Sequence, residues 1–158
     1  MLSHARALLT SAPEGACAYV DADIRSTGTI LREAADILDF SRPVAVCLIM
    51  VLQFVPDQDN PWQIVRTLMD AVPSGSYLAV AHPASDVDQE VGPALRQLSS
   101  RMGSTKATPR SREQIARFFD GLEMLEPGLV QLHRWRTAAD APGVERDLAA
   151  YGGIGRKP

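Results

Sequence analysis

Hydrophobic positions along the chain alternate between short continuous runs and stripes at helical spacing. The continuous runs predict strands at residues 16–20, 44–52 and 77–81. The stripes predict helices within residues 2–9, 27–38 and 61–72. Strands that alternate with helices are typical of an α/β fold with a mostly parallel sheet. The run at 44–52 carries no polar residue, which predicts a strand covered on both faces.

Residues at the ends of the helical stripes support these boundaries. Ser26 or Thr27 can cap the helix predicted within residues 27–38, and Asn60 precedes Pro61 at a position where proline suits the first helical turn. The stretch from Ser111 to Gln114 matches a capping box and predicts a further helix with Ile115, Phe118 and Phe119 on its buried side.

The C-terminal third of the chain has a different order of elements. Candidate strands at 122–130 and 151–154 follow each other without a clear helix between them, which predicts an antiparallel sheet edge. We also expect a weak helical stretch at 86–102 and a loop at 138–144.

Composition narrows the class of protein. The chain has 158 residues, 46% of them apolar and 22% charged, which favours one globular domain. A net charge of -3 argues against nucleic acid as a partner. The longest apolar run, 44–55, is too short to span a membrane, and no signal peptide opens the chain, so we expect a cytoplasmic protein. Cys17 and Cys47 are expected to be buried and reduced, and neither belongs to a metal site.

Ligands of open α/β sheets bind beyond the carboxyl ends of the strands, so the residues that follow each strand are the candidate site. Asp21 and Asp23 follow the first strand; they can accept hydrogen bonds from an adenine amino group or a ribose, or simply form a solvated turn. Gln53 and Phe54 follow the second strand, where they can floor a ligand pocket or form an ordinary exit into a loop.

Other polar residues give weaker signals. His82 follows the third strand and is a candidate general base, although a structural role is the more common fate of a lone histidine. The basic loop with Lys106, Arg110 and Arg112 is expected to be a solvated connection, with contact to an anionic substrate as the less common alternative. The run Gly152-Gly153-Ile154-Gly155 is not expected to bind phosphate, because only three residues follow it and no helix begins there.

Several sequence segments resemble a family of S-adenosylmethionine-dependent methyltransferases common in actinobacteria. The similarity is nearly collinear over the chain and rests on these strings: HARALLTSAPEGACAYVDADIR, ILDFSRPVAV, LQFVPDQDNPWQIVRTLMDAVPSGSYLAVAH, SREQIARFFDGLEMLEPGLV and YGGIGRKP. The resemblance implies a Rossmann-like class I methyltransferase sheet that ends in a C-terminal antiparallel hairpin. It also implies S-adenosylmethionine as the cofactor, bound across the carboxyl ends of the early strands.

The resemblance assigns roles to individual positions. Asp23 matches the acid that reads the adenine, with Ile24 beside the ring. The segment that lines the methionine part of the cofactor corresponds to Met50, Val51, Leu52, Gln53 and Phe54. His82 falls where a residue can face the methyl acceptor. The family usually has histidine at the position of Gln53, which weakens acid–base chemistry there.

Two family elements have no counterpart in the sequence: the first strand with its glycine-rich turn, and the second strand with its ribose-binding acid. We therefore expect residues 1–158 to form a single, N-terminally incomplete methyltransferase domain that lacks the first two strands. Their absence would leave the strand at 16–20 without a neighbour and expose an edge of the strand at 44–52, inviting pairing with another chain. As a monomer, the chain is expected to bind the cofactor weakly or not at all.

Three functions remain open from the sequence. The leading one is methyl transfer from S-adenosylmethionine to an unidentified acceptor, with a small molecule favoured because the chain is acidic. The second is a non-catalytic α/β module that dimerises or is completed by a partner through the exposed strand edge. The third is a nucleotide-binding α/β protein without methyl transfer.

Overall fold

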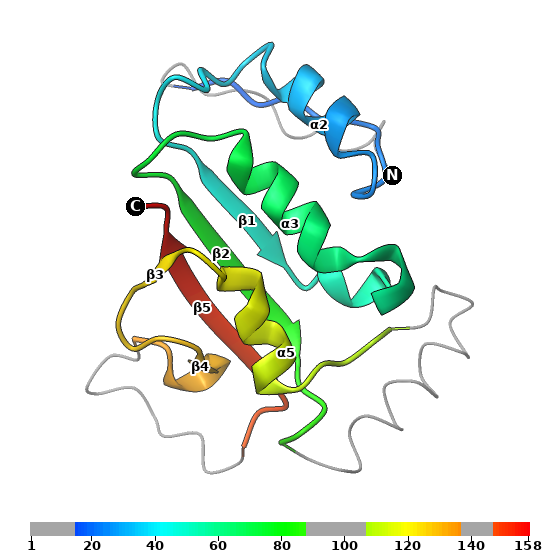
Figure 1. Ribbon diagram of the computed structural model, residues 1–158, viewed down its shortest axis with the longest axis vertical. Coiled ribbons are helices and arrows are strands. Elements are labelled where there is room, and N and C mark those ends of the chain that lie inside the picture. Colours follow the sequence, from blue (N-terminus) through cyan, green and yellow to red (C-terminus); the bar gives the residue numbers. More distant parts are fainter. Residues whose placement is uncertain (1–14, 88–106, 137–146) are drawn as a thin grey trace.

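A computed structural model describes residues 15–87, 107–136 and 147–158 (Figure 1). Its sheet has the order β1-β2-β5-β3, and β4 also pairs with β5. The strands are β1 (Ala45–Ile49), β2 (Tyr77–Pro83), β3 (Glu123–Met124), β4 (Val130–Gln131) and β5 (Ala150–Arg156). Strands β1 and β2 run parallel, whereas β5 is antiparallel to β2, β3 and β4. The predicted α/β class with an antiparallel C-terminal part is confirmed.

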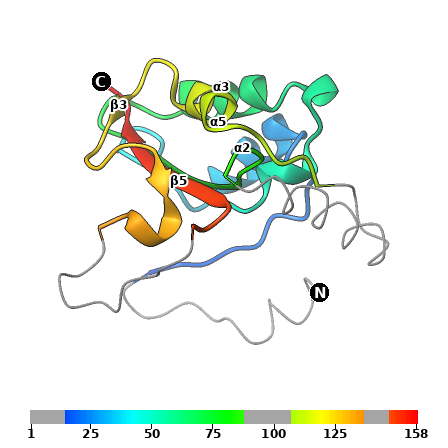
Figure 2. The same cartoon turned by 90° about the horizontal axis from the view of Figure 1, so that it is seen from below.

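Helices and short 3-10 turns connect these strands. The α-helices are α2 (Thr27–Ala34), α3 (Pro61–Asp70) and α5 (Arg112–Ala116). The 3-10 turns are η1 (Leu52–Phe54), η2 (Asp57–Asp59), η3 (Arg117–Phe119) and η4 (Leu132–Arg134). Helices α3 and α5 lie on the same side of the sheet (Figure 2), and α2 contacts α3. No helix in the described part of the chain is long and apolar enough to cross a membrane.

The predicted helix boundaries hold where the caps are strong. The side chain of Asn60 accepts a hydrogen bond from the Gln63 N–H and fixes the start of α3 at Pro61. The capping box between Ser111 and Gln114 is formed in both directions at the start of α5. Ser26 is the N-cap residue of α2, although its side chain makes no capping hydrogen bond.

The hydrophobic core lies between the sheet and the helices α3 and α5. Leu52, Leu78 and Ile115 are fully buried at its centre, and Phe118 and Phe119 close it as predicted. A Cβ on Gly155 would lie 3.0 Å from both Leu122 Cβ and Phe119 Cδ1. The glycine-rich run of β5 is therefore a close-packing surface, which agrees with its rejection as a phosphate loop.

Four expectations about the N-terminal half are wrong. Residues 16–20 form no strand, because no described strand lies beside them to accept and donate backbone hydrogen bonds. Strand β1 ends at Ile49, and its exposure alternates instead of being low throughout, with Ile49 57% exposed. Cys17 and Cys47 are exposed. Helix α2 ends at Ala34, which leaves Ile37 and Leu38 exposed.

The helix expected within 2–9, most of the helical stretch at 86–102 and the loop expected at 138–144 lie outside the described residues.

Candidate functional site

Arg25 joins the turn before α2 to the segment after β1. Its guanidinium donates to both carboxylate oxygens of Asp23, at 2.8 and 2.9 Å, and to the Asp59 carboxylate at 2.8 Å. It also donates to the Phe54 carbonyl at 3.2 Å. The turn that carries Asp23 is thus fixed against the exit of β1 although the two are about thirty residues apart in the sequence.

Asp23 is held as a carboxylate. Hydrogen bonds from the Arg25 backbone N–H and guanidinium, together with the guanidinium charge, keep the pKa of Asp23 below its usual value. Its side chain is 54% exposed, so the ion pair contributes little to stability. The carboxylate therefore remains accessible as a hydrogen-bond acceptor for a ligand.

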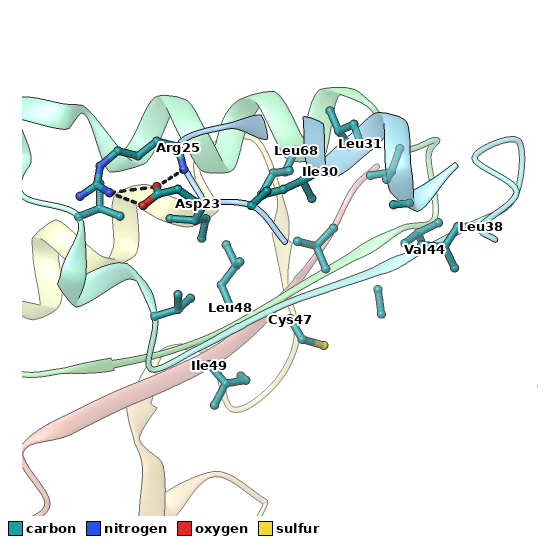
Figure 3. Close-up of a pocket in the computed structure, with 18 of the residues that line it drawn as sticks. Asp23, Arg25, Ile30, Leu31, Leu38, Val44, Cys47, Leu48, Ile49 and Leu68 are labelled. Atoms are coloured by element: carbon teal, nitrogen blue, oxygen red, sulfur yellow. Dashed lines mark hydrogen bonds and ion pairs between the residues drawn. The ribbon is translucent and has the colours of Figure 1, made fainter. Parts of the chain in front are cut away.

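A groove of about 670 Å³ runs from this ion pair along the outer edge of β1 (Figure 3). Asp23, Ile24, Val51 and Phe54 line it at the polar end. Towards the other end its lining is apolar and comes from α2, β1 and α3: Ile30, Leu31, Ala34, Val46, Leu48, Leu68 and Val72. The groove thus combines a small polar corner with a long apolar floor.

The segment after β1 divides the residues assigned to the cofactor into two groups. Val51 and Phe54 line the groove together with Asp23 and Ile24. Met50 has a positive φ of 53° and donates its N–H to the Ala81 carbonyl at 2.9 Å, which turns the chain sharply away from β1. Leu52 points into the core and is fully buried. The structure therefore does not place Met50, Leu52 or Gln53 on the groove.

Gln53 is buried with half of its amide unsatisfied. Its side-chain NH2 donates to the Met50 carbonyl at 2.7 Å, which fixes the orientation of the amide because the reverse orientation would oppose two oxygens. The side chain is 5% exposed, and Oε1 has no hydrogen-bond partner among the described residues. A buried hydrogen-bond acceptor of this kind lowers the stability of the fold unless a donor reaches it.

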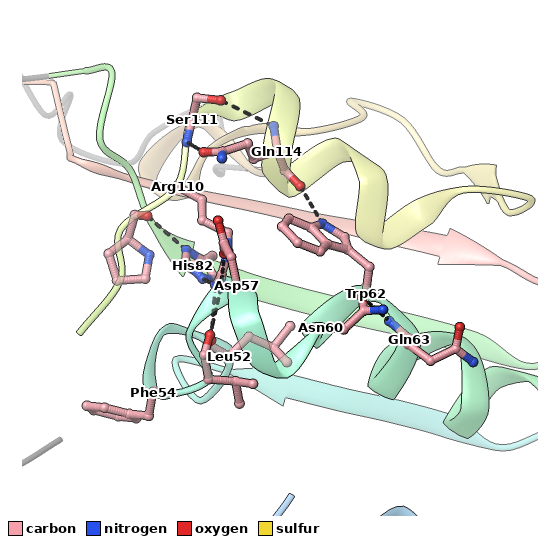
Figure 4. A network of polar contacts seen from close by, with 12 residues as sticks. Leu52, Phe54, Asp57, Asn60, Trp62, Gln63, His82, Arg110, Ser111 and Gln114 are labelled. Carbon is pink, nitrogen blue, oxygen red and sulfur yellow. Dashed lines mark hydrogen bonds and ion pairs between the residues drawn. The ribbon is translucent and has the colours of Figure 1, made fainter. Parts of the chain in front are cut away.

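A second polar cluster, centred on Arg110, lies under the same segment (Figure 4). Arg110 is fully buried and donates to the Leu52 carbonyl at 3.1 Å and the Val55 carbonyl at 2.7 Å. It also pairs with Asp57 at 2.7 Å. This cluster fixes the path of the chain from the end of β1 to the start of α3.

His82 completes the cluster as a neutral imidazole. Its Nε2 lies 2.9 Å from the Arg110 guanidinium and can only accept, so Nδ1 carries the proton towards the Pro83 carbonyl, also at 2.9 Å. Burial, reinforced by the charge of Arg110, lowers the pKa of His82 to about 4. Both ring nitrogens are occupied and the ring is fully buried. This geometry gives His82 a structural role and lends no support to the predicted general base.

The sequence did not predict the structural roles of Arg25, Arg110 and Arg112. Arg110 lies in the loop that was expected to be solvated; it is buried because a bridge between Ala84 and Arg110 draws residues 107–111 along the end of β2. Arg112 is exposed, but its guanidinium donates a hydrogen bond to the Leu129 carbonyl at 2.9 Å. No sequence pattern marks Arg110, whereas Arg25 could have been found as the nearest cation to Asp23.

Comparisons with known proteins show the family to which the chain belongs. The whole chain, residues 1–158, matches the family described as S-adenosyl methyltransferase. The chain belongs to this family. The resemblance seen in the sequence is thereby confirmed, and S-adenosylmethionine is the cofactor of the family. No functionally curated protein matches the chain significantly.

Two solved structures are similar over almost the entire chain. A DUF574 family protein from Streptomyces avermitilis MA-4680 is 41% identical, with a TM-score of 0.90 over 99% of this chain and 61% of its own. A candidate methyltransferase from Thermobifida fusca YX is 31% identical, with a TM-score of 0.83 over 99% of this chain and 59% of its own. The chain therefore spans about 60% of the length of each of these relatives.

The described residues fit one part of S-adenosylmethionine. Asp23 offers an acceptor for the adenine amino group, and Ile24 and Phe54 offer apolar surface for the ring. The ribose and the charged amino-acid tail need carboxylate and N–H partners, and the apolar floor of the groove supplies none. Among the described residues, no group of three His, Cys, Asp or Glu side chains could hold a metal ion.

Proposed function

We propose that this chain supplies the adenine side of a methyltransferase site that acts on a small-molecule acceptor. When bound, S-adenosylmethionine supplies an electrophilic methyl group. The chain's own residues hold and orient one end of the ligand, and the ribose and tail contacts must come from residues outside the described part of the chain. The observation that carries the proposal is that one carboxylate, Asp23, and two apolar side chains, Ile24 and Phe54, line the same groove.

Rigidity of this corner supports the assignment. Arg25 fixes Asp23 relative to the Phe54 carbonyl, and Arg110 fixes the Leu52 and Val55 carbonyls on either side of Phe54. The hydrogen-bond acceptor of Asp23 and the apolar surface of Phe54 are therefore in place before a ligand binds. This reduces the entropic cost of binding. Alignment of this kind is the main contribution that a protein makes to methyl transfer.

Formation of S-adenosylhomocysteine tests the proposal even while the acceptor is unidentified. The chain is co-expressed with the part of the Streptomyces avermitilis protein that lies outside the matched region, and the product is incubated with S-adenosylmethionine. Separate reactions contain a small-molecule metabolite pool, bulk RNA, DNA or denatured protein. The proposal predicts product only with the small-molecule pool, reduced at least tenfold by Asp23→Asn and unchanged by Asp36→Asn. Product with nucleic acid or protein alone, or no product with any pool, would contradict it.

A further inference from the structure

A second pocket, of about 430 Å³, lies between the end of α3, η3 and residues 157–158. Helices α3 and α5, the latter continuing directly into η3, cover the same side of the sheet (Figure 2). Among the described residues, none lines both this pocket and the groove beside β1. Val65 and Met69 of α3 line the second pocket, whereas Leu68 lines the groove. Helix α3 therefore separates the second pocket from the proposed cofactor site.

The floor of the second pocket is apolar and well packed. Val65, Met69 and Phe118 line the pocket and belong to the buried core. Leu122 lines it beside them and is partly buried. An apolar group of a ligand placed on this floor would be removed from water, which favours binding.

Arg117 borders the second pocket with a guanidinium whose orientation is set by Trp62. The central carbon of the guanidinium lies 4.1 Å from the centroid of the indole ring, a cation–π contact. The indole is itself fixed, because its Nε1 donates to the Gln114 carbonyl at 3.0 Å (Figure 4) and its ring stacks on Phe118. Stacking leaves the N–H groups at the edge of the guanidinium available, and their fork matches the two oxygens of a carboxylate. Within the described part of the chain, no hydrogen bond or ion pair uses them.

A second guanidinium borders the same pocket. Arg66 follows Trp62 by four residues in α3, so the two side chains lie on one face of the helix. Like that of Arg117, its guanidinium has no hydrogen-bond or ion-pair partner among the described residues. Two such cations beside an apolar floor favour a ligand with a negative charge at one end and an apolar body.

Other charges around the second pocket limit the negative charge of the ligand. Asp70 and Asp120 also line it, and neither forms an ion pair in the described structure, so a ligand with several negative charges would be repelled. The negative end of α3 would repel an anion too, but the Lys157 ammonium already donates to the Met69 and Val72 carbonyls there. A single negative charge is therefore the charge that the pocket accepts best.

We propose that the second pocket binds a small organic monocarboxylate, whose carboxylate pairs with Arg117 and Arg66 and whose apolar body packs on the floor. Its volume of about 430 Å³ lies within the range of roughly 300–1,000 Å³ that is typical of small-molecule sites. The two arginines supply the charge and the direction, and the floor supplies the preference for a hydrophobic acid. The pocket is separate from the groove, so it can be occupied whether or not the proposed function holds.

Titration of the nitrogen-15-labelled chain with hexanoate, followed by nuclear magnetic resonance, tests the proposal. We expect saturable shifts of the Trp62 indole N–H and of the Arg117 side-chain N–H signals. Acetate lacks the apolar body, hexanol lacks the charge and citrate carries several charges, so each should bind at least tenfold more weakly than hexanoate. Absence of a saturable shift at Trp62 with hexanoate, or equal binding of any of the other three compounds, would overturn the proposal.

Three variants show which groups recognise the carboxylate. Arg117→Gln removes the charge, whereas Arg117→Lys keeps a charge but loses the planar fork. We expect the affinity for hexanoate to fall at least tenfold in Arg117→Gln and at least threefold in Arg117→Lys. Arg32→Gln removes an exposed arginine of α2 that lines neither the groove nor this pocket, and it should leave the affinity unchanged. Because Arg32 and Arg117 are both exposed, these changes should not unfold the chain. Equal affinities of Arg117→Gln and Arg32→Gln would contradict the proposed site.

Discussion

The guanidinium of Arg110 lies 2.9 Å from Nε2 of His82, and both side chains are fully buried. The contact joins the end of β2 to residues 107–111, and through the Leu52 and Val55 carbonyls it reaches the segment after β1. The ring planes of Trp62 and Phe118 flank the same guanidinium, with centroids 5.4 and 5.8 Å from its central carbon. This cluster stabilises the shape of the candidate site without contacting a ligand.

Replacing Arg110 by methionine should destabilise the chain strongly. The substitution keeps much of the side-chain volume but leaves the Leu52 and Val55 carbonyls and the His82 ring buried without donors. Losses of this kind cost about 2–4 kcal/mol. Urea denaturation measures the change, with Arg117→Met as the exposed control, since Arg117 also stacks on Trp62. A loss under about 1 kcal/mol for Arg110→Met would contradict the role of the cluster.

His82 should make stability depend on pH in a specific window. Its pKa is about 4 in the folded chain and near 6.5 when unfolded, so the unfolded state takes up the proton first as pH falls. The contribution is complete above pH 6.5 and is lost progressively between pH 6.5 and about 4, amounting to roughly 3 kcal/mol at most. Denaturation from about pH 4.5 to 7.5 should show this slope in the wild type and a weaker slope in His82→Gln. Parallel curves would refute the buried neutral imidazole.

Lys157 should contribute to the end of α3. Its ammonium donates to the Met69 and Val72 carbonyls at 2.9 and 2.8 Å, where a cation also meets the negative end of the helix. We expect Lys157→Met to lower the free energy of unfolding by about 1–2 kcal/mol. Arg156→Met removes only an exposed contact to Glu123 and should cost less than half as much. Equal losses would mean that the capping contact is unimportant.

A side chain at Gly155 should force its neighbours apart. A methyl group there would lie 3.0 Å from Leu122 Cβ and Phe119 Cδ1, so both groups would have to shift by a few tenths of an ångström, and Gly155→Ala should cost about 1–3 kcal/mol. A methyl group on Gly28 in α2 would have nothing within 4 Å, and Gly28→Ala should leave stability unchanged or raise it by up to about 1 kcal/mol. Thermal unfolding of both variants checks the contrast.

Local signals in the sequence predicted the starts of α3 and α5 and the parallel-to-antiparallel order of the sheet. Asn60 with Pro61 and the Ser111 capping box act within a few residues, so their effect can be recognised without knowing the fold. The apolar runs marked β1 and β2 for the same reason. Residues 16–20 were mispredicted because a strand needs a neighbour, and no described strand supplies one.

The candidate site was predictable only in part. Asp23 and Phe54, named from predicted strand ends, both line the groove, although the strand expected before Asp23 is not formed. Ile24 and Val51, which also line it, were named only from the family resemblance. The roles of Arg110 and His82 depend on contacts between positions 28 residues apart, and charge patterning alone marks such an arginine as solvated. The exposure of Cys47 likewise follows from the incompletely covered face of the sheet to which its side chain points, which local hydrophobicity cannot reveal (Figure 3).

Calorimetric titration with S-adenosylmethionine tests most directly the claim that this chain carries one side of a cofactor site. We predict no micromolar binding by the isolated monomer and micromolar binding by its complex with the unmatched part of the Streptomyces avermitilis protein. Asp23→Asn in that complex should weaken binding at least tenfold. Micromolar binding by the isolated monomer would contradict the account.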